Sequence, residues 1–252
     1  MSKKLKNIIC DIDGVLLHQN SLIEGSDRFI ARVLKQGNPL IILTNYPSQT
    51  QADLQNRLRE AGIEVPESVL YTSAMATAAF LSRQEGRKAF VVGEGGLTHE
   101  LYKSGFTITD INPDVVVVGE TKSYNVDMIQ KAAYFIMKGA RFIATNPDVA
   151  GPKGEPACGA LCAPIERITG KKPFYVGKPS AWMMRAALNN INAHSENTVI
   201  IGDNLNTDIL AGIQAGLETI LVLTGYSQMD DIQNVPFRPN HIFARAADID
   251  VV

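Results

Sequence analysis

The sequence predicts an α/β protein with a doubly wound parallel sheet and a second α/β domain inserted into the chain. Two observations carry this prediction. Short β-branched runs alternate with amphipathic stretches along the 252 residues, which is typical of a parallel sheet covered by helices. Most of the runs are apolar throughout, as expected of strands covered on both faces, whereas a strand with one solvated face would alternate apolar and polar residues.

Nine runs are expected to be strands, with helices between them. In chain order the expected strands are Asn7–Cys10, Leu40–Leu43, Val69–Thr72, Ala89–Val92, Val115–Val118, Phe142–Ala144, Phe174–Val176, Val199–Ile201 and Thr219–Leu223. The stretch 27–36 predicts a helix because its apolar residues fall on one stripe, and Gly37 is a typical helix stop. The stretch 49–61 predicts another helix, which ends at Gly62.

Two polar segments, residues 82–88 and 170–173, suggest where the chain divides. Nine strands would make a large single open sheet, and the length allows two modest domains. We therefore expect a Rossmann-like core formed by residues 1–84 and 175–252, and an inserted α/β domain formed by residues 88–174.

The composition excludes several classes of function. Apolar residues make up 45% and charged residues 20%, which describes an ordinary globular protein. Twenty-four Lys and Arg stand against 26 Asp and Glu, so the formal net charge is −2. No basic field therefore indicates binding to nucleic acid or to an anionic membrane. A small, locally bound anionic substrate remains possible.

The chain carries no predicted membrane span or leader. Its longest apolar run, Ala132–Met137, is far shorter than the roughly 18 residues that a span needs. The apolar stretch near the N-terminus ends at Asp11, before a signal peptide could form, so we expect a cytoplasmic protein. The odd, sparse set of Cys10, Cys158 and Cys162 predicts buried packing rather than disulfides or a metal site.

Paired carboxylates follow the first expected strand. Asp11 and Asp13 come directly after it and before Gly14, at the strand end where α/β sheets bind ligands. The same Asp-x-Asp spacing at Asp248 and Asp250 has no strand before it and no glycine after it, and predicts only a solvated surface. The first pair is therefore a candidate site, with a capped strand-end turn as the alternative.

Hydrogen-bond donors follow two other strands. Thr44 and Asn45 follow the strand 40–43 and could donate to an oxyanion, although on their own they are more typical of a turn. Lys178 follows the strand 174–176 and precedes an expected helix that begins near Ser180. A lysine is unfavourable beside a helix N-terminus unless an anion lies between them. Taken alone, it fits a phosphate contact and a solvated lysine about equally well.

A further strand ends in carboxylates as well. Asp203 follows Gly202 at the end of the strand 199–201, and Asp208 lies five residues later at the start of a helix. By itself Asp208 would be a helix cap. Because parallel strands bring their carboxyl ends to one edge, these carboxylates can converge on a hard cation such as Mg²⁺, with Thr44 and Lys178 available for an anion.

Four segments together resemble the four motifs of the haloacid dehalogenase-like phosphatases, in order and in character. They are Asp11–Leu16, Thr44–Asn45, Lys178–Ser180 and Gly202–Asp208. The resemblance covers the whole chain, and the insert is similar to the α/β cap domain of the nitrophenylphosphatase-like subfamily. The stretches 44–48, 71–77 and 144–148 look like those of its bacterial ribonucleotide monophosphatases.

The resemblance implies a catalytic and a metal-binding set. Asp11 would be the nucleophile that forms an aspartyl-phosphate, and Asp13 would be the general acid and then the general base. Mg²⁺ would be held by Asp11, the backbone carbonyl of Asp13 and Asp203, with Asp208 supporting from close by. Hydrolysis of a phosphate ester needs the acid at Asp13, which disfavours dehalogenation.

The resemblance also implies substrate contacts. Thr44, Asn45 and Lys178 would bind the phosphoryl oxygens, with Asp13 and Asn204 beside the substrate. Losing Lys178 or Asp203 would lower the rate while leaving the fold intact.

The implied substrate is a small phosphorylated metabolite, in particular a nucleoside 5′-monophosphate such as UMP or GMP. Asn146 and Asp148 in the insert are candidates for contacts beyond the phosphate, with a plain Asn-Pro turn as the alternative. A phosphatase for a sugar phosphate or pyridoxal phosphate, a phosphotransferase, and a non-catalytic sensor of a phosphorylated metabolite are the alternative functions. We expect a monomer or weak dimer without a nucleic-acid or membrane partner.

Overall fold

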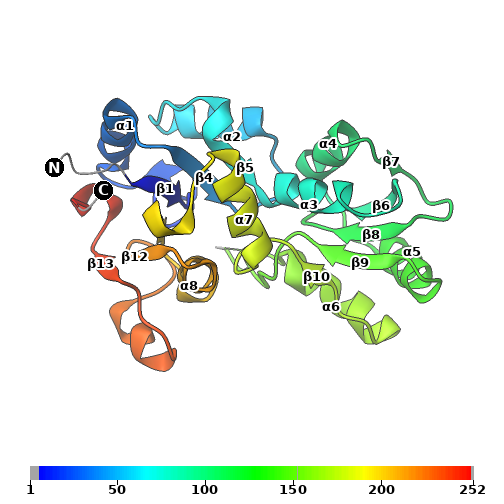
Figure 1. Cartoon of the computed structure of the whole chain (residues 1–252). Coiled ribbons are helices and arrows are strands. Elements are labelled where there is room, and N and C mark those ends of the chain that lie inside the picture. Colours follow the sequence, from blue (N-terminus) through cyan, green and yellow to red (C-terminus); the bar gives the residue numbers. More distant parts are fainter. Residues whose placement is uncertain (1–5, 152, 251–252) are drawn as a thin grey trace. The chain divides into compact units, whose positions relative to one another are not determined.

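The computed structural model describes residues 6–151 and 153–250 and consists of two compact units (Figure 1). Among these residues, unit 1 comprises 6–44, 52–71 and 178–250, and unit 2 comprises 45–51 and 72–177. Each unit is built around its own parallel sheet. The α/β fold predicted from the sequence is confirmed.

The sheet of unit 1 has the strand order β13-β12-β11-β1-β4-β5. Its strands are β1 (Asn7–Cys10), β4 (Leu40–Thr44), β5 (Leu70–Thr72), β11 (Thr198–Gly202), β12 (Glu218–Val222) and β13 (His241–Phe243). The chain runs outward from β1 to β5 in one direction and from β11 to β13 in the other. β1 and β11 pair in parallel at this reversal, which is where open α/β sheets bind ligands.

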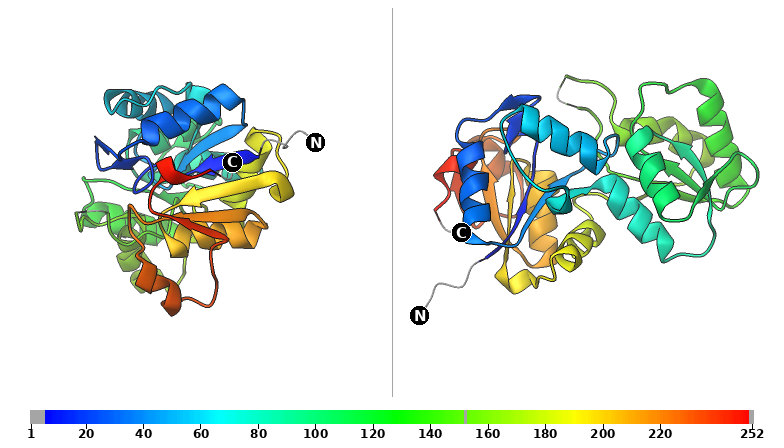
Figure 2. Two further views of the ribbon diagram at one scale, coloured as in Figure 1. Left: turned by 90° about the vertical axis from the view of Figure 1, so that its left-hand side faces the viewer. Right: turned by 90° about the horizontal axis from the view of Figure 1, so that it is seen from above.

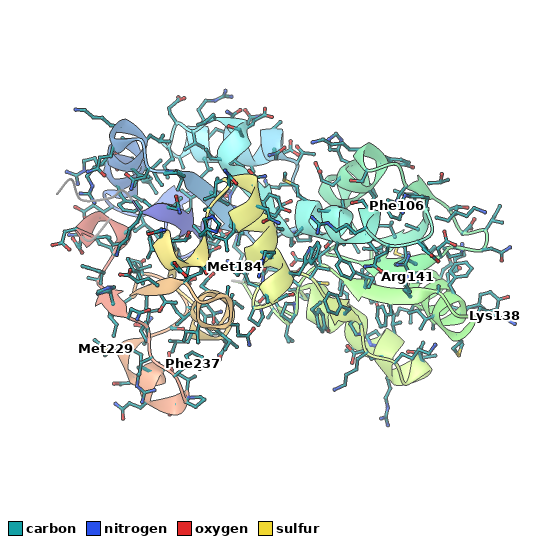
Figure 3. All side chains as sticks on the ribbon, in the orientation of Figure 1. Phe106, Lys138, Arg141, Met184, Met229 and Phe237 are labelled. Atoms are coloured by element: carbon teal, nitrogen blue, oxygen red, sulfur yellow. The ribbon has the colours of Figure 1, made fainter. Side chains whose placement is uncertain are left out.

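Helices cover both faces of this sheet (Figure 2). They are α1 (Ser26–Gln36), α2 (Gln51–Glu60), α7 (Ala181–Asn190) and α8 (Leu210–Ala215), with 3₁₀ turns at Glu67–Val69, Ser195–Asn197, Met229–Asn234 and Ala246–Asp248. α1 ends at Gly37 in the left-handed conformation, as its sequence predicts. On α7, Met184 is fully buried, so this helix contributes to the core (Figure 3).

The sheet of unit 2 has the order β10-β9-β8-β6-β7. Its strands are β6 (Lys88–Val92), β7 (Thr107–Ile108), β8 (Val115–Val118), β9 (Arg141–Ala144) and β10 (Phe174–Tyr175), and its helices are α3 (Ser73–Ser82), α4 (Gly95–Lys103), α5 (Val126–Met137) and α6 (Cys158–Thr169). Buried side chains of α5 and α6 pack on the valines of β8 to form a separate core. Unit 2 therefore has its own hydrophobic core, as a domain does.

The structure contains short strands that the sequence pattern did not predict. They are the hairpin of β2 (Leu17–His18) and β3 (Ser21–Leu22), together with β7 and β13. Each has only two or three residues, too few to show a period. They complete the edges of the sheets or, in the case of the hairpin, a loop next to Asp13.

The division into units differs in detail from the expected domain boundaries. Residues 45–51 and α3 lie in unit 2, whereas the expected insert begins at residue 88. The backbone nitrogen of Gly96 in α4 donates to Ser48 O (3.0 Å), which ties the earlier segment to unit 2. The boundaries 1–84, 88–174 and 175–252 stay a prediction.

The cysteines are buried and free. Cys10 ends β1, and Cys158 and Cys162 lie in the core of unit 2, where Cys158 Sγ donates to Val118 O (3.2 Å). Asp248 and Asp250 are exposed, as predicted for a solvated surface. Within residues 6–151 and 153–250, none of the helices has the length and hydropathy that a membrane crossing requires.

Candidate active site

A buried lysine joins two of the predicted carboxylates at the carboxyl edge of the unit 1 sheet. Lys178 Nζ lies 2.5 Å from Asp11 Oδ1 and 2.6 Å from Asp208 Oδ1. Asp11 continues β1, and its backbone nitrogen donates to Ile201 O of β11 (2.9 Å). Lys178 is only 2% exposed and Asp208 only 1%, so the three charges interact in a medium of low dielectric. Residues from three separate motifs thus meet at one point.

Asp203 completes a cluster of three carboxylates. One oxygen each from Asp11, Asp203 and Asp208 lie within 4.8 Å of one another. Lys178 neutralises one of these three charges, so the cluster with its lysine keeps two formal negative charges. A buried excess of two negative charges, offered by hard oxygen ligands, suits a divalent cation such as Mg²⁺. The donor set therefore fits the metal that the sequence predicts.

Glycines hold the Asp203 carboxylate in place. A side chain at Gly14 or at Gly225 would overlap the Asp203 carboxylate, so both backbones approach it as closely as only glycine allows. The backbone nitrogen of Tyr226 donates to Asp203 Oδ2 (2.6 Å), and Thr224 Oγ1 donates to Gly14 O (2.6 Å). The loop after β12 therefore belongs to the site.

This loop was missed by the sequence analysis. The signal was present, because Thr224 and Gly225 follow an apolar strand of the same parallel sheet, as Thr44 and Gly202 do. Neither residue carries a charge that would have drawn attention to it.

Asp208 is oriented by a turn of π-helix, Leu205–Ile209, that follows β11. The backbone nitrogen of Asn204 donates to Asp208 Oδ2 (3.2 Å), and a side chain at Gly202 would overlap Asp208. Asn204 itself caps this turn, because its Oδ1 accepts from the backbone nitrogen of Asn206 (2.9 Å). The side chain predicted to contact substrate therefore has a structural partner here, and its substrate role stays a prediction.

Burial and mutual repulsion shift the protonation of the cluster. Desolvation raises the pKa of Asp11 well above its usual range, although Lys178 opposes the shift. Desolvation, with Asp208 nearby, raises the pKa of Asp203 to about 7. Burial lowers the pKa of Lys178, but Asp11 and Asp208 together outweigh it and raise that pKa above its ordinary value. The lysine is therefore charged, and a cation bound to the cluster would further favour the ionised form of Asp11 and Asp203.

Asp13 lies outside this ion-pair cluster and has a partner of its own. Its side chain is 38% exposed, and its Oδ1 lies 2.6 Å from Nη2 of Arg57 on α2. The sequence analysis did not identify Arg57, because a single arginine on an amphipathic helix has no distinguishing pattern.

The second predicted motif divides between the units. Thr44 ends β4 in unit 1 and is buried, whereas Asn45 belongs to unit 2. There Asn45 Nδ2 donates to Asp148 Oδ2 (2.8 Å), and Asn146 Nδ2 donates to the same oxygen (2.8 Å). The structure therefore brings Asn45 together with the two residues predicted to contact the substrate beyond its phosphate.

Glu120 is a further member of this polar group that sequence reasoning missed. It follows β8, and its Oε1 accepts from Asn146 Nδ2 (3.3 Å). Burial raises the pKa of Glu120 to about 7, and the nearby Asp148 adds to the shift while the bond from Asn146 opposes it. The sequence did contain a signal for Glu120, because an acidic residue follows the buried strand of four valines.

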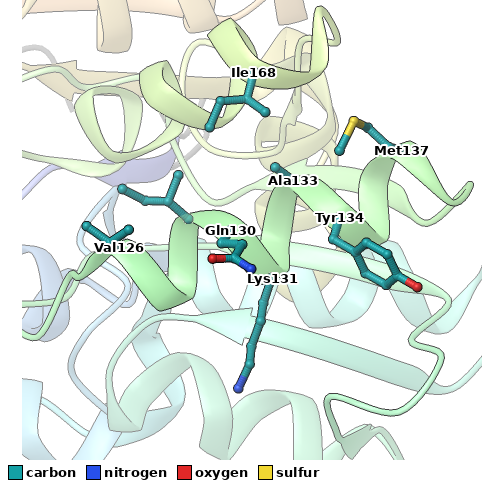
Figure 4. A pocket seen from close by; sticks show the side chains of 8 residues that line it. Val126, Gln130, Lys131, Ala133, Tyr134, Met137 and Ile168 are labelled. Atoms are coloured by element: carbon teal, nitrogen blue, oxygen red, sulfur yellow. The ribbon is translucent and has the colours of Figure 1, made fainter.

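A pocket of about 410 Å³ lies on unit 2, and none of the polar residues described above lines it (Figure 4). It is lined by Val126, Ile129, Gln130, Lys131, Ala133, Tyr134, Met137 and Ile168. Its one cation, Lys131, already pairs with Asp110 (3.4 Å) and Asp127 (3.2 Å). The pocket is mostly apolar and does not have the donors that a phosphate requires.

Comparison with known proteins shows the family to which the chain is similar. Residues 8–107 match the profile of the family described as "Haloacid dehalogenase-like hydrolase", and residues 175–249 match that described as "HAD-hydrolase-like". The chain is 66% identical to the ribonucleotide monophosphatase NagD of Escherichia coli K12, over 98% of this chain and 99% of the relative. The solved structure of that relative superposes with a TM-score of 0.96 over 99% of this chain and 100% of that one.

Two further relatives are less similar in sequence. The dihydroxyacetone phosphatase of Corynebacterium glutamicum is 46% identical, over 96% of this chain and 89% of the relative. The solved p-nitrophenyl phosphatase from Archaeoglobus fulgidus is 31% identical and has a TM-score of 0.91, with 98% of each chain covered. All three relatives are named as phosphatases.

Proposed function

The chain belongs to the haloacid dehalogenase-like hydrolase family, and we propose that this phosphoric monoester hydrolase acts on nucleoside 5′-monophosphates such as UMP and GMP through an aspartyl-phosphate. The observation that carries the proposal is the buried cluster of Asp11, Lys178, Asp203 and Asp208 at the carboxyl edge of the sheet. Transfer of a phosphoryl anion requires a nucleophilic carboxylate and positive charge around the phosphate. Asp11 offers the carboxylate, Lys178 is a fixed positive charge, and the excess negative charge of the cluster suits a divalent cation.

The first half-reaction transfers the phosphoryl group to Asp11. A carboxylate oxygen of Asp11 forms a bond to phosphorus while the bond from phosphorus to the leaving oxygen breaks in line. Asp13, which is partly exposed beside the cluster, gives its proton to the leaving oxygen. The alcohol, here a nucleoside, departs.

The second half-reaction returns the enzyme to its starting state. Asp13 takes a proton from a water molecule, whose oxygen then bonds to phosphorus as the bond to Asp11 breaks. Inorganic phosphate leaves, and Asp13 is protonated again for the next turnover. Lys178 would shield the repulsion between the phosphate and Asp11 in both halves.

We propose Mg²⁺ as the cation. The carboxylates of Asp11 and Asp203 and the backbone carbonyl of Asp13 would hold it, with Asp208 supporting from close by. When bound, the ion supplies charge neutralisation at the phosphoryl oxygens.

The remaining predicted residues would bind substrate. Thr44, Asn45 and Lys178 would donate to the phosphoryl oxygens, with Asn204 nearby. Asn146 and Asp148 would contact the part of the substrate beyond the phosphate, in keeping with their hydrogen-bonded link to Asn45. Unit 2 would accordingly act as the specificity domain.

The names of the relatives support two substrate classes. The ribonucleotide monophosphatase at 66% identity favours nucleotides. The dihydroxyacetone phosphatase at 46% identity favours a small sugar phosphate as the second candidate. Both are small phosphorylated metabolites and need the same unit 1 chemistry.

A substrate panel tests the proposal. Release of phosphate would be measured from UMP, GMP, glucose 6-phosphate, dihydroxyacetone phosphate and pyridoxal phosphate, with and without Mg²⁺. We expect the highest kcat/KM for the nucleotides, dependence on the metal, and no turnover by Asp11→Asn. Binding without release in a single turnover would indicate a sensor, and transfer to added alcohols would indicate a phosphotransferase. Unchanged nucleotide selectivity in Asn146→Ala would contradict the role given to that residue.

We place this reaction in the cytoplasm, in keeping with three free, buried cysteines. A monomer or weak dimer, acting without nucleic acid or membrane, stays our prediction.

A further inference from the structure

Arg57 joins the predicted general acid to the hairpin that follows it. Its Nη2 donates to Asp13 Oδ1 (2.6 Å) and to the backbone oxygen of Gln19, and its Nε donates to Asn20 Oδ1 (3.2 Å). The Arg57 side chain is only 16% exposed. One planar guanidinium thus binds three acceptors, one from Asp13 and two from the tip of the hairpin, through two of its nitrogens in a fixed geometry.

The hairpin is connected directly to Asp13. The backbone nitrogen of Gly14 donates to Leu17 O (2.7 Å), and β2 and β3 pair through Leu17 with Leu22 and His18 with Ser21. Gln19, at the tip, has a positive φ of 58°, a conformation that residues other than glycine adopt at a cost. Because Arg57 binds both Asp13 and this tip, it restrains the segment 13–20 at both of its ends.

Asp13 depends on such restraint more than the other carboxylates do. Asp11 and Asp208 are buried and bonded to Lys178, and Asp203 is enclosed by glycines and by the nitrogen of Tyr226. The Asp13 side chain, in contrast, is 38% exposed and follows the strand in a loop. A charge-assisted hydrogen bond of 2.6 Å fixes its rotamer.

We propose that Arg57 is a positioning residue for proton transfer by Asp13. The inference rests on the proposed function, in which Asp13 protonates the leaving oxygen. Arg57 donates to one carboxyl oxygen of Asp13, so the transferable proton resides on the other oxygen. With the carboxyl plane fixed in this way, the acid O–H points in one direction and stays there through turnover. In this role Arg57 acts on the reaction through its bond to Asp13 Oδ1.

Esters with different leaving groups separate positioning of the acid from a structural role. An alkoxide such as the 5′-oxygen of UMP needs a proton as it departs, whereas p-nitrophenolate is a weak base and needs little help. The parameter kcat/KM reports the steps up to formation of the aspartyl-phosphate, which include this proton transfer. We expect Arg57→Ala to lower kcat/KM for UMP by at least roughly tenfold, a part of the ~10²–10⁴-fold that general acids contribute. For p-nitrophenyl phosphate we expect a change within about threefold, because that step does not require the acid.

Matched variants sharpen the comparison. Arg59→Ala removes an exposed arginine of the same helix, whose Nη2 donates to Asn56 Oδ1 (2.8 Å). This variant should leave kcat/KM for both esters unchanged. Arg57→Lys keeps the positive charge but not the planar guanidinium, so its kcat/KM for UMP should lie between those of the wild type and Arg57→Ala. Asn20→Ala removes one of the two hairpin contacts of Arg57 and leaves those to Asp13 and to Gln19 O, so it should change kcat/KM for UMP less than Arg57→Ala does.

Several outcomes would overturn the inference. An equal loss for both esters would show that Arg57 only supports the fold, and no loss for UMP would show that Asp13 needs no such support. If Arg57→Ala does not fold, Arg57→Met, which keeps the aliphatic packing, takes its place. Failure of Arg57→Met and Arg57→Lys to fold as well would make the residue structural and refute the proposal. If the wild type releases no phosphate from either ester, the proposed function fails instead, so the two failures are distinguishable.

Discussion

Replacement of Lys178 by methionine tests the central charge arrangement of the site. Methionine approximates the length of the lysine stem, so the substitution removes the ammonium group while keeping much of the packing. The variant loses the ion pairs to Asp11 (2.5 Å) and Asp208 (2.6 Å) together. It should affect stability and rate through separate effects.

The expected loss of stability follows from burial. Lys178 and Asp208 are at most 3% exposed in their side chains and Asp11 is 10% exposed, so water cannot replace the ammonium group without rearrangement. Removing one partner from a buried ion pair costs about 3–5 kcal/mol, since the other charge is left uncompensated. Such a loss is large beside the ~5–15 kcal/mol that stabilises a typical domain, but it need not prevent folding.

The expected loss of rate follows from the charge of the substrate. Removing one group that stabilises charge in the transition state costs on the order of 10²–10³ in rate, and Lys178 also orients the nucleophile. We therefore expect kcat/KM for UMP to fall at least roughly 100-fold. Phosphate release and urea-induced unfolding would be measured on the same preparation.

Lys131→Met is the matched control. Lys131 also bridges two carboxylates, those of Asp110 (3.4 Å) and Asp127 (3.2 Å), but its side chain is 41% exposed. Exposed pairs of this kind contribute little to stability, because water and salt screen the charges. If Lys178→Met costs no more stability than Lys131→Met, the buried carboxylates are not held by the lysine. If its kcat/KM matches that of the wild type, Lys178 does not bind the phosphoryl group.

Three further predictions concern the surroundings of the cluster. Gly225→Ala forces the new methyl group against Asp203 and should lower kcat/KM roughly 100-fold, the effect of an ångström-scale misplacement. Gly95→Ala is the control and should have no effect, because a methyl group there meets open space. Equal activities of the two variants would refute the close fit at Gly225. Mg²⁺ at 100 times its dissociation constant should stabilise the wild type by about 2.7 kcal/mol and Asp203→Asn much less in thermal or urea unfolding, and equal stabilisation of both would place the ion elsewhere. Burial raises the pKa of Glu120 from 4.5 to about 7, so the native state binds more protons than the unfolded state between these values and loses stability as the pH rises through them. Glu120→Gln does not titrate, so its free energy of unfolding should rise by roughly 2–3 kcal/mol relative to that of the wild type between about pH 5 and about pH 8. The exposed control Glu85→Gln should show no such trend. A difference between Glu120→Gln and the wild type that does not change with pH would contradict the burial argument.

The residues at strand ends could be predicted because burial determines where strands lie. β1, β4 and β11 are almost continuous apolar runs, and parallel pairing brings the residues that follow them to one edge. For Asp11, Asp203 and Asp208 the sequence position therefore largely determines the location in space. Lys178 differs, because it follows β10, which pairs with β9 in the sheet of unit 2, so the order of strands in the unit 1 sheet does not explain where Lys178 lies. The same reasoning predicted the parallel sheets of both units.

Contacts that depend on loop conformation could not be predicted in this way. The bond from Arg57 to Asp13 requires α2 to lie beside a short hairpin that has no sequence period. The bond from Asn45 to Asp148 joins residues 103 positions apart, each in a loop. Sequence indicated that Asp13, Asn45 and Asp148 carry chemistry and gave no indication of Arg57, because the partners of these side chains follow from packing that only the fold determines.

The charge of the cluster explains why so many glycines surround it. Three carboxylates with one lysine are unfavourable together in a buried site, so without further support each would turn toward solvent. Gly14, Gly202 and Gly225 let the backbone come close enough to hold Asp203 and Asp208 where repulsion would otherwise separate them. Repulsion among the carboxylates therefore destabilises the folded state, and a bound divalent cation would relieve part of this repulsion. Stability and catalysis should therefore depend on the same ion, and a substitution that relaxes the carboxylates, such as Asp208→Asn, should stabilise the metal-free protein while it lowers the rate.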